Sequence, residues 1–289
     1  MNSSIKDSGI HRIKLGKYWT GWLSGSEDTK RLICETLLDN PDQLFSDADR
    51  FIKQDGRNCV AVKTIERDSE KIRLVLKRHV PVNFMKQFCR RFIFSKAEQN
   101  IKKTVLLRSL GIPVVEVYAA LQKAGLIRIR ETVLIIPFYE NSPNLHHFLE
   151  GMSDEPYSAY QIKRQLCMQI AEIFSTLHKA GIWHRDSKSS NLIVTPREGE
   201  LKIRLVDMDG IKHNLIRGKR GRYFTLWRLA ASLMLLIKVN KTDYMRFFQE
   251  YCDMMGIPDC RRRIMFRELS RMAEKKYQRL KLRSVLHEL

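Results

Sequence analysis

The chain has 289 residues and carries 52 Lys and Arg against 32 Asp and Glu, which gives a formal net charge of +20. This balance favours anionic partners such as a phosphorylated substrate, an acidic membrane surface or nucleic acid. The six cysteines show neither Cys-x-x-Cys spacing nor a framework pattern. Their spacing argues against a zinc site and predicts free thiols in a reducing compartment.

Targeting and membrane signals are missing from the sequence. Residues 1–17 are polar and contain no apolar core of a secretory signal. The longest apolar run, Leu229 to Ile237, is far shorter than the roughly 18 residues needed to cross a bilayer. We therefore expect a cytoplasmic protein that is either soluble or peripheral at a membrane.

Short alternating apolar runs predict a sheet in the first half of the chain. Residues 1–45 are mixed in character and are interpreted as an N-terminal extension. After them, a charged turn joins two alternating segments, which predicts a hairpin. A helix follows, and Gly111 and Pro113 mark its end. The predicted ranges are 58–65 and 72–77 for the hairpin strands, 95–110 for the helix, and 114–119 and 132–137 for two further strands.

The apolar period becomes helical after Pro137. Apolar residues recur every three or four positions from Ile162 to Leu177, which predicts one amphipathic helix. Short strands are expected at 191–194 and 201–206, and the pattern is helical from Tyr223 onward.

The whole pattern predicts an α+β protein with two lobes. A small antiparallel-sheet lobe comes first, and a larger helical lobe follows it. We place the extension at 1–45, the sheet lobe at 46–138 and the helical lobe at 139–289, with a hinge near 137–141.

One segment of the helical half has the layout of a phosphoryl-transfer centre. His184-Arg-Asp186 is followed by Asn191, and Asp207 comes 21 residues after Asp186. Phosphoryl transfer depends on positioning and charge neutralisation, so it needs a base, metal ligands and a cation on the phosphates. Asp186 is the candidate base, while Asn191 and Asp207 offer oxygen ligands for Mg²⁺. Lys188 is placed to reach the γ-phosphate, and His184 is assigned a supporting role in the loop.

The first half should supply a lysine for the nucleotide phosphates, and two candidates exist. Lys63 ends Val-Ala-Val-Lys on the first hairpin strand, and Lys77 ends Leu-Val-Leu-Lys on the second. The strand that precedes a helix is the expected place for this lysine, which favours Lys77. Glu98 on that helix would then pair with Lys77 and orient it. Lys63 is the alternative, and otherwise it is a solvated charge on a strand.

These motifs resemble those of the protein-kinase-like superfamily and, within it, the lipopolysaccharide core kinases that phosphorylate Kdo or heptose. The resemblance extends from Leu44 to Ile257. It implies a protein-kinase-like bilobal fold, ATP and Mg²⁺ as cofactors, and an alcohol group of a sugar as acceptor. The segments that carry it are residues 51–60, Arg91-Phe-Ile-Phe-Ser-Lys-Ala-Glu98, Gly111-Ile-Pro113, His184-Arg-Asp186 with Asn191, Val206-Asp-Met-Asp209 and Leu226-Trp-Arg-Leu-Ala-Ala-Ser-Leu-Met234.

Departures from the protein-kinase pattern narrow the class of molecule that can be the acceptor. No Gly-x-Gly-x-x-Gly precedes the hairpin, and Gly56 alone remains to approach the nucleotide, which would then be held more by side chains. Asp-Met-Asp replaces Asp-Phe-Gly, with Asp207 the metal ligand by position and Asp209 a second candidate. No Ala-Pro-Glu follows, and protein kinases use that region to dock an extended peptide. The departures therefore disfavour a protein substrate.

Basic residues gather in three segments. The first, between Gly210 and Leu229, contains no acidic residue and lies where the resemblance places the acceptor cleft. There it would suit an anionic sugar or glycolipid, and the alternative is a solvated loop. The second is interleaved with phenylalanines that either pack in the core or face anionic lipid, and the third is a basic helix over 261–283. The first segment contains Lys212, Arg217, Lys219, Arg220, Arg222 and Arg228. The second contains Lys86, Arg90, Arg91, Lys96, Lys102 and Lys103, interleaved with Phe84, Phe88, Phe92 and Phe94.

The resulting hypothesis is an ATP-dependent kinase of the lipopolysaccharide inner core, acting on Kdo or heptose at the cytoplasmic face of the inner membrane. A protein serine/threonine or small-molecule kinase is one alternative, and a non-catalytic kinase-like binding module is another. Nucleic-acid binding ranks last because no recognition motif accompanies the charge.

Overall fold

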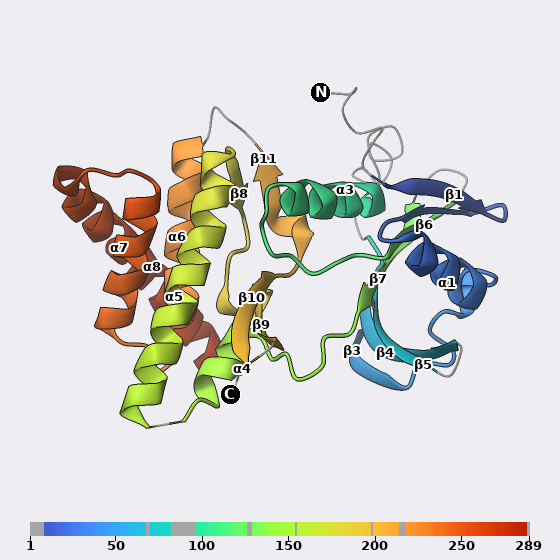
Figure 1. The fold of residues 1–289 in the computed structure, drawn as a ribbon, viewed down its shortest axis with the longest axis horizontal. Coiled ribbons are helices and arrows are strands. Elements are labelled where there is room, and N and C mark those ends of the chain that lie inside the picture. Colours follow the sequence, from blue (N-terminus) through green and yellow to red (C-terminus); the bar gives the residue numbers. More distant parts are fainter. Residues whose placement is uncertain are drawn as a thin grey trace. The chain divides into compact units, whose positions relative to one another are not determined.

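Two separate units of secondary structure make up the chain. The computed structural model describes residues 9–67, 70–81, 96–125, 129–153, 155–197, 199–213 and 218–287. The first unit comprises Met1–Ser109 and Val115–Tyr139, and the second comprises Leu110–Val114 and Glu140–Leu289. An antiparallel sheet dominates the first unit and helices dominate the second (Figure 1). The mixed class expected from the sequence is confirmed.

In the described part of the first unit, seven strands form one antiparallel sheet in the order β1-β2-β6-β7-β5-β4-β3. The predicted hairpin is confirmed as β4 and β5, which pair from Asn58 with His79 to Arg67 with Glu70. The strand bounds are His11–Leu15 (β1), Trp19–Leu23 (β2), Arg50–Asp55 (β3), Asn58–Arg67 (β4), Glu70–His79 (β5), Ala119–Ala124 (β6) and Ile129–Pro137 (β7).

The segment expected as an N-terminal extension, residues 1–45, is not separate from the sheet. Its strand β2 pairs with β6, and β1 pairs with β2. Helix α1 (Glu27–Leu37) also belongs to it and begins where Ser26 accepts a hydrogen bond from the Thr29 backbone N–H. A serine cap followed by acidic residues satisfies free backbone donors and suits the helix dipole, which explains why a helix starts here.

Two helices cover opposite faces of this sheet. Helix α1 packs on one face, where the core includes apolar residues from the helix and from strands β2, β4, β5, β6 and β7. Helix α3 (Lys96–Ser109), predicted at 95–110, packs on the other face (Figure 1). It is followed by Gly111, whose φ of 74° is the left-handed conformation typical of a helix end. The first face includes Leu32, Ile33, Leu37, Leu74, Leu76, Leu121 and Ile135, and the second includes Trp22, Ala97, Ile101 and Ala120.

The strand predicted at 114–119 is wrong. Val114 forms an isolated bridge with Leu205, and the regular strand β6 begins only at Ala119. The backbone between them is satisfied in other ways, since the Val117 carbonyl accepts from the Ser24 hydroxyl and the Tyr118 carbonyl accepts from the Ser24 N–H. Residues 114–119 are mostly apolar because the segment is buried, and a buried segment does not have to pair with another strand.

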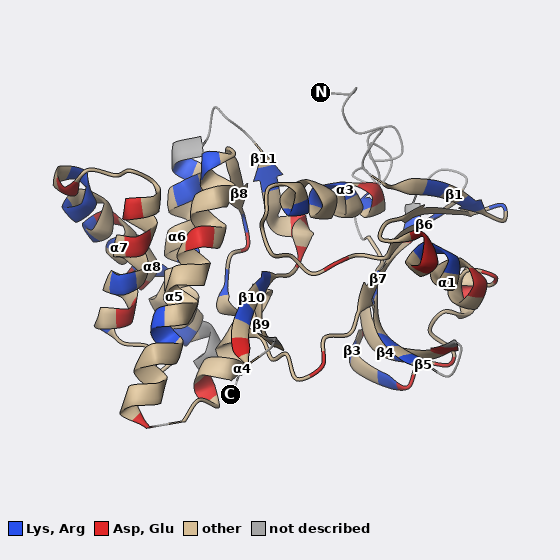
Figure 2. Cartoon of the chain, viewed as in Figure 1, with Lys and Arg blue, Asp and Glu red and all other residues tan. Residues whose placement is uncertain are grey.

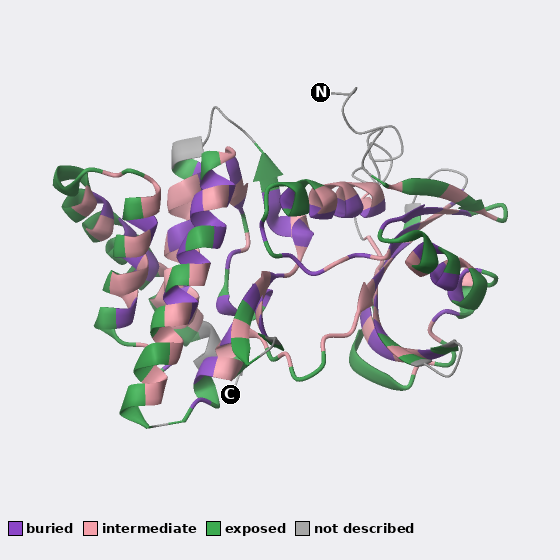
Figure 3. Ribbon diagram, viewed as in Figure 1, coloured by how far each residue is buried: buried purple, intermediate pink, exposed green. Residues whose placement is uncertain are grey.

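Long helices and a short ribbon form the second unit. The predicted amphipathic helix is confirmed as α5, Pro156–Lys179, with the apolar stripe buried (Figure 3). The Glu155 side chain caps its start, and Gly181, with φ of 69°, follows its end. The remaining elements are α4 (Leu145–Glu150), β8 (Ile182–His184), a 3₁₀ turn (Ser189–Asn191), β9 (Leu192–Arg197), β10 (Glu200–Leu205), a second 3₁₀ turn (Met208–Gly210), β11 (Ile211–His213), α6 (Gly218–Leu233), α7 (Lys241–Met254) and α8 (Asp259–His287).

The described cysteines are free thiols, as the sequence predicts. Burial raises the pKa of Cys167 and that of Cys252 to about 11, so both remain protonated at neutral pH. Cys89 lies outside the described residues. Among the residues that the structure describes, no helix is long and apolar enough to cross a membrane.

Candidate active site

A two-stranded ribbon brings the two predicted metal ligands to one end. Strands β9 and β10 are antiparallel, and Leu192 pairs with Leu205. Asn191 directly precedes β9 and Asp207 follows β10, and the Val206 N–H donates to the Asn191 carbonyl at 2.9 Å. Residues 16 apart in sequence therefore lie beside one another because the ribbon pairs their neighbours.

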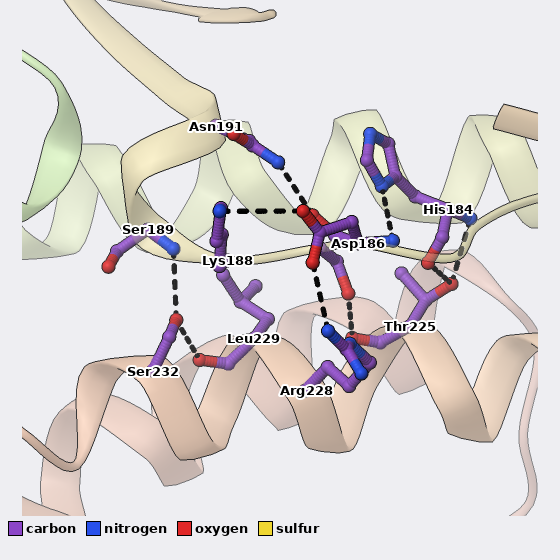
Figure 4. Close-up of polar contacts among 10 residues, drawn as sticks. His184, Asp186, Lys188, Ser189, Asn191, Thr225, Arg228, Leu229 and Ser232 are labelled. Atoms are coloured by element: carbon purple, nitrogen blue, oxygen red, sulfur yellow. Dashed lines mark hydrogen bonds and ion pairs between the residues drawn. The ribbon is translucent and has the colours of Figure 1, made fainter. Parts of the chain in front are cut away.

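The predicted base lies in the loop between β8 and the 3₁₀ turn at Ser189–Asn191. His184, which ends β8, is fully buried, and its Nδ1 accepts a hydrogen bond from the Asp186 backbone N–H at 3.1 Å (Figure 4). The Asn191 Nδ2 donates to the Asp186 carbonyl at 2.7 Å. His184 and Asn191 thus hold the backbone of Asp186 on both sides, and His184 acts as a support of the loop.

The carboxylate of Asp186 contacts two cations. Its Oδ1 accepts from the Arg228 Nη2 at 2.8 Å, and its Oδ2 lies 3.4 Å from the Lys188 Nζ (Figure 4). Burial raises the pKa of Asp186, but the charge of Lys188 and the hydrogen bond from Arg228 together outweigh it and leave the pKa lowered. Asp186 is therefore ionised at neutral pH and able to orient a hydroxyl group.

Helix α6 supports this loop through hydroxyl groups that the sequence analysis did not single out. The Thr225 Oγ1 accepts from the His184 N–H at 3.0 Å, and the Ser187 hydroxyl donates to the Thr225 carbonyl at 2.6 Å. Two turns further along the same helix, the Ser232 Oγ accepts from the Ser189 N–H at 2.9 Å. Ser and Thr inside an apolar helix are a weak sequence signal, since such hydroxyls more often bond their own helix backbone.

The turn that carries Asp207 has an unusual backbone. Asp207 has φ of 64° and ψ of 75°, a left-handed conformation that Asp tolerates better than most residues. Three residues later, a Cβ added to Gly210 would lie 2.3 Å from the His184 Cε1, so this position has no room for a side chain. The Arg185 N–H donates to the Gly210 carbonyl at 2.7 Å. The turn and the loop are therefore tied together.

The donors at the end of the ribbon suit a hard divalent cation. The Asn191 amide nitrogen is engaged with the Asp186 carbonyl, which leaves the amide oxygen as its ligand atom, and Asp207 adds a carboxylate. In the part of the chain that the structure describes, no group of three or more His, Cys, Asp or Glu is arranged to hold a metal. A magnesium ion here would need phosphate oxygens and waters to complete its coordination, which is how Mg²⁺ is commonly held.

In the first unit, the two candidate lysines lie on opposite faces of the sheet. Lys77 pairs with Leu134 and lies in the row that includes Ala120, on the face covered by α3. Lys63 pairs with Leu74, on the face covered by α1, and its Nζ lies 3.9 Å from the Asp47 carboxylate. Glu98 lies on α3, so it shares the face of Lys77 and not that of Lys63.

Glu98 itself forms an ion pair with Lys102, at 2.6 Å and one turn along α3. Its pairing with Lys77 therefore stays a prediction. Gly56 lies in the two-residue turn between β3 and β4, where the Asp55 carboxylate accepts from the N–H groups of Arg57 and Asn58. Those two donors are engaged, so this turn has fewer backbone groups for phosphate than a glycine-rich loop would offer.

The basic segment before Leu229 is only partly described. Arg228 contacts Asp186 instead of lying free for an acceptor, while Lys212 and Arg220 are exposed. Arg220 and Arg222 belong to the first turns of α6 (Figure 2). Arg217 lies outside the described residues, and the side chain of Lys219 is not described. Lys86, Arg90, Arg91, Phe84, Phe88, Phe92 and Phe94 of the second cluster also lie outside the described residues.

Comparison with known proteins decides the family. The family model described as "Lipopolysaccharide kinase (Kdo/WaaP) family" matches residues 62–251. The chain belongs to this family. It is accordingly an ATP-dependent phosphotransferase with an alcohol group as acceptor, and a kinase of lipopolysaccharide synthesis. The matched range contains all of the predicted site residues except Gly56, which precedes it.

Among solved structures, one titled "WaaP in complex with acyl carrier protein" is similar to this lipopolysaccharide kinase. The TM-score is 0.62 at 18% sequence identity, over 88% of this chain and 99% of that chain. At this identity the likeness shows the fold alone, and it confirms the predicted protein-kinase-like fold. A sequence comparison with curated proteins gives no match.

Proposed function

We propose that this lipopolysaccharide kinase transfers the γ-phosphoryl group of ATP to a hydroxyl group of an inner-core sugar, either Kdo or heptose. The observation that carries the proposal is the arrangement of Asp186, Asn191 and Asp207, which the loop and the ribbon hold together. A base and two oxygen ligands side by side suit phosphoryl transfer, because this reaction needs alignment and charge neutralisation more than covalent help.

The residues take separate roles in the transfer. The acceptor hydroxyl oxygen forms a bond to the γ-phosphorus, the bond to the leaving ADP oxygen breaks, and the hydroxyl proton passes to Asp186. Asn191 and Asp207 would hold Mg²⁺, which neutralises charge on the phosphates when it is bound. Lys188 lies on the open side of Asp186 with its side chain 46% exposed, so it is free to turn toward the γ-phosphate.

In the first unit, Lys77 is the proposed anchor of the nucleotide phosphates. It shares its face of the sheet with α3, which carries Glu98, whereas Lys63 lies on the other face and near Asp47. Gly56 is proposed to approach the nucleotide as well, although Asp55 engages the next two N–H groups of its turn. Side chains therefore hold the phosphates more than backbone donors do.

The test is phosphate transfer from labelled ATP to purified core saccharides that contain only Kdo or Kdo with heptose. A Kdo kinase should label both saccharides, and a heptose kinase should label only the one that contains heptose. D186A and D207A should lose at least about 10³-fold in kcat, since each removes a group that acts on the reacting atoms. K63A is the matched control and should transfer normally. Absence of transfer to both saccharides by folded protein would defeat the proposal, and labelling of a protein instead would favour the protein-kinase alternative.

We further propose that the outer face of α8 contacts anionic lipid. Lys and Arg are the commonest of its exposed side chains, and Ile264 and Leu282 are 60% and 64% exposed among them. Basic and apolar side chains on one exposed helix suit a peripheral contact with anionic headgroups. The protein should float with vesicles that contain phosphatidylglycerol and not with phosphatidylcholine alone, and equal behaviour with both would reject the contact. The exposed basic residues are Arg261, Arg263, Arg267, Arg271, Lys275, Arg279 and Lys281.

A further inference from the structure

Arg228 makes a contact that its place in the sequence does not suggest. It lies 42 residues after Asp186, on α6, in a segment expected to face the acceptor. Its Nη2 instead donates to the Asp186 Oδ1 at 2.8 Å (Figure 4). The guanidinium carbon lies 5.3 Å from the centre of the Phe224 ring and 5.9 Å from that of Trp227. Two aromatic rings therefore restrict the arginine beside the base.

The rest of α6 fixes this arginine relative to the loop. Thr225, Arg228 and Ser232 are separated by three and four positions, so they lie on one face of the helix. Thr225 and Ser232 both bond the backbone of the loop, at His184 and Ser189 respectively. Arg228 stands between these two contacts, and the helix cannot shift along the loop without breaking them. The contacts on both sides of Arg228 along α6 therefore fix the position of its guanidinium group.

The two cationic side chains that contact Asp186 differ in how firmly they are held. Lys188 contacts Oδ2 at 3.4 Å and has a 46% exposed side chain, whereas Arg228 contacts Oδ1 at 2.8 Å and is 25% exposed. A long contact by an exposed lysine is weak and easily exchanged, while a short contact by a stacked arginine is not. Lys188 is therefore suited to leave the carboxylate for the phosphate, and Arg228 is suited to stay.

We propose that Arg228 is the positioning residue of the base: it occupies the Asp186 Oδ1 throughout the reaction and so directs Oδ2 toward the acceptor hydroxyl. This inference rests on the proposed function for the role of Asp186 as the base and for the identity of the acceptor. The hydroxyl proton goes to Oδ2, and Arg228 donates its hydrogen bond without losing a proton. After product release, Asp186 returns that proton to water.

The experiment compares R228Q and R228K with R246Q. Arg246 is a close match, because its Nη1 lies 3.1 Å from the Asp243 Oδ1, Lys163 contacts the same carboxylate, and its guanidinium lies 4.8 Å from the Tyr160 ring. A crystal structure of each variant locates the Asp186 carboxylate. The kcat and the KM for ATP are then measured with the core saccharides.

In R228Q, the Asp186 carboxylate should turn away from its wild-type orientation, and kcat should fall by about 10- to 100-fold with the KM for ATP unchanged, as expected for a misaligned group. R228K should restore only part of kcat, because a lysine keeps the charge and loses the planar fork. R246Q should change neither the orientation nor kcat. A wild-type orientation of the Asp186 carboxylate in R228Q would overturn the inference.

The two proposals can fail separately. If the Asp186 carboxylate is displaced in R228Q but no saccharide is phosphorylated by the wild type, the substrate proposal falls and the positioning of Asp186 by Arg228 stands. If the wild type phosphorylates a saccharide and R228Q does so with unchanged kcat, the role of Arg228 falls and the substrate proposal stands.

Discussion

Substitution of Gly210 by alanine tests how tightly the metal-bearing turn packs on the catalytic loop. The added Cβ would lie 2.3 Å from the His184 Cε1 and 2.6 Å from its Nδ1, and His184 is fully buried, so the ring has no open space to enter. Overpacking of this kind costs about 1–3 kcal/mol of the free energy of unfolding. Displacement of the ring would also weaken its bond from the Asp186 N–H, worth about 1 kcal/mol.

We therefore expect G210A to lower the free energy of unfolding by about 2–4 kcal/mol, measured by denaturant melts. The kcat should fall by about 100-fold even where the protein is fully folded, because the backbone of Asp186 moves with the ring. G151A is the matched control, since its Cβ would meet only the His147 carbonyl, at 3.4 Å. Wild-type stability together with wild-type kcat in G210A would refute the packing argument.

Further predictions concern the metal, the nucleotide and pH. D207N should raise the Mg²⁺ concentration for half-maximal activity by about tenfold or more while the fold persists, since asparagine also tolerates the left-handed backbone; an unchanged Mg²⁺ dependence would remove Asp207 as a ligand. K77A should raise the KM for ATP by about tenfold or more and K63A should not, as measured by steady-state kinetics, and the reverse result would exchange their roles. Burial raises the pKa of Asp186, and the charge of Lys188 is the largest of the opposing effects that lower it. K188M should thus move the acid limb of kcat/KM, which reports the enzyme before ATP binds, to higher pH, and a limb that stays in place would contradict this.

Local patterns in the sequence were enough to predict much of the fold. The β4–β5 hairpin, α3 with Gly111 after it, and α5 each follow from a period and a stop signal within a few residues. The strand at 114–119 failed because an apolar run reports burial and not pairing. Strand β2 was missed because its partner β6 lies far away in the chain, and β1 was missed with it because β1 pairs with β2.

Only part of the candidate site could likewise be predicted from the sequence. Asp186 and Asn191 belong to one short motif, so their proximity could be predicted from spacing. The contact of Arg228 with Asp186 could not, because it depends on how α6 packs against the loop, 42 residues away. The side of the sheet on which Lys77 lies also required the register of β5 with β7, which sequence alternation alone leaves open.

The missing side chain at Gly210 has a mechanical consequence. The His184 ring fills the space beside Gly210, and the same ring holds the backbone N–H of Asp186. Strand β11 starts at the next residue and pairs with β8, which fixes the other side of the turn. A displacement of the turn that carries Asp207 must therefore displace the base as well. The proton acceptor and the metal ligand behave as one body, and a single added methyl group is enough to disturb both.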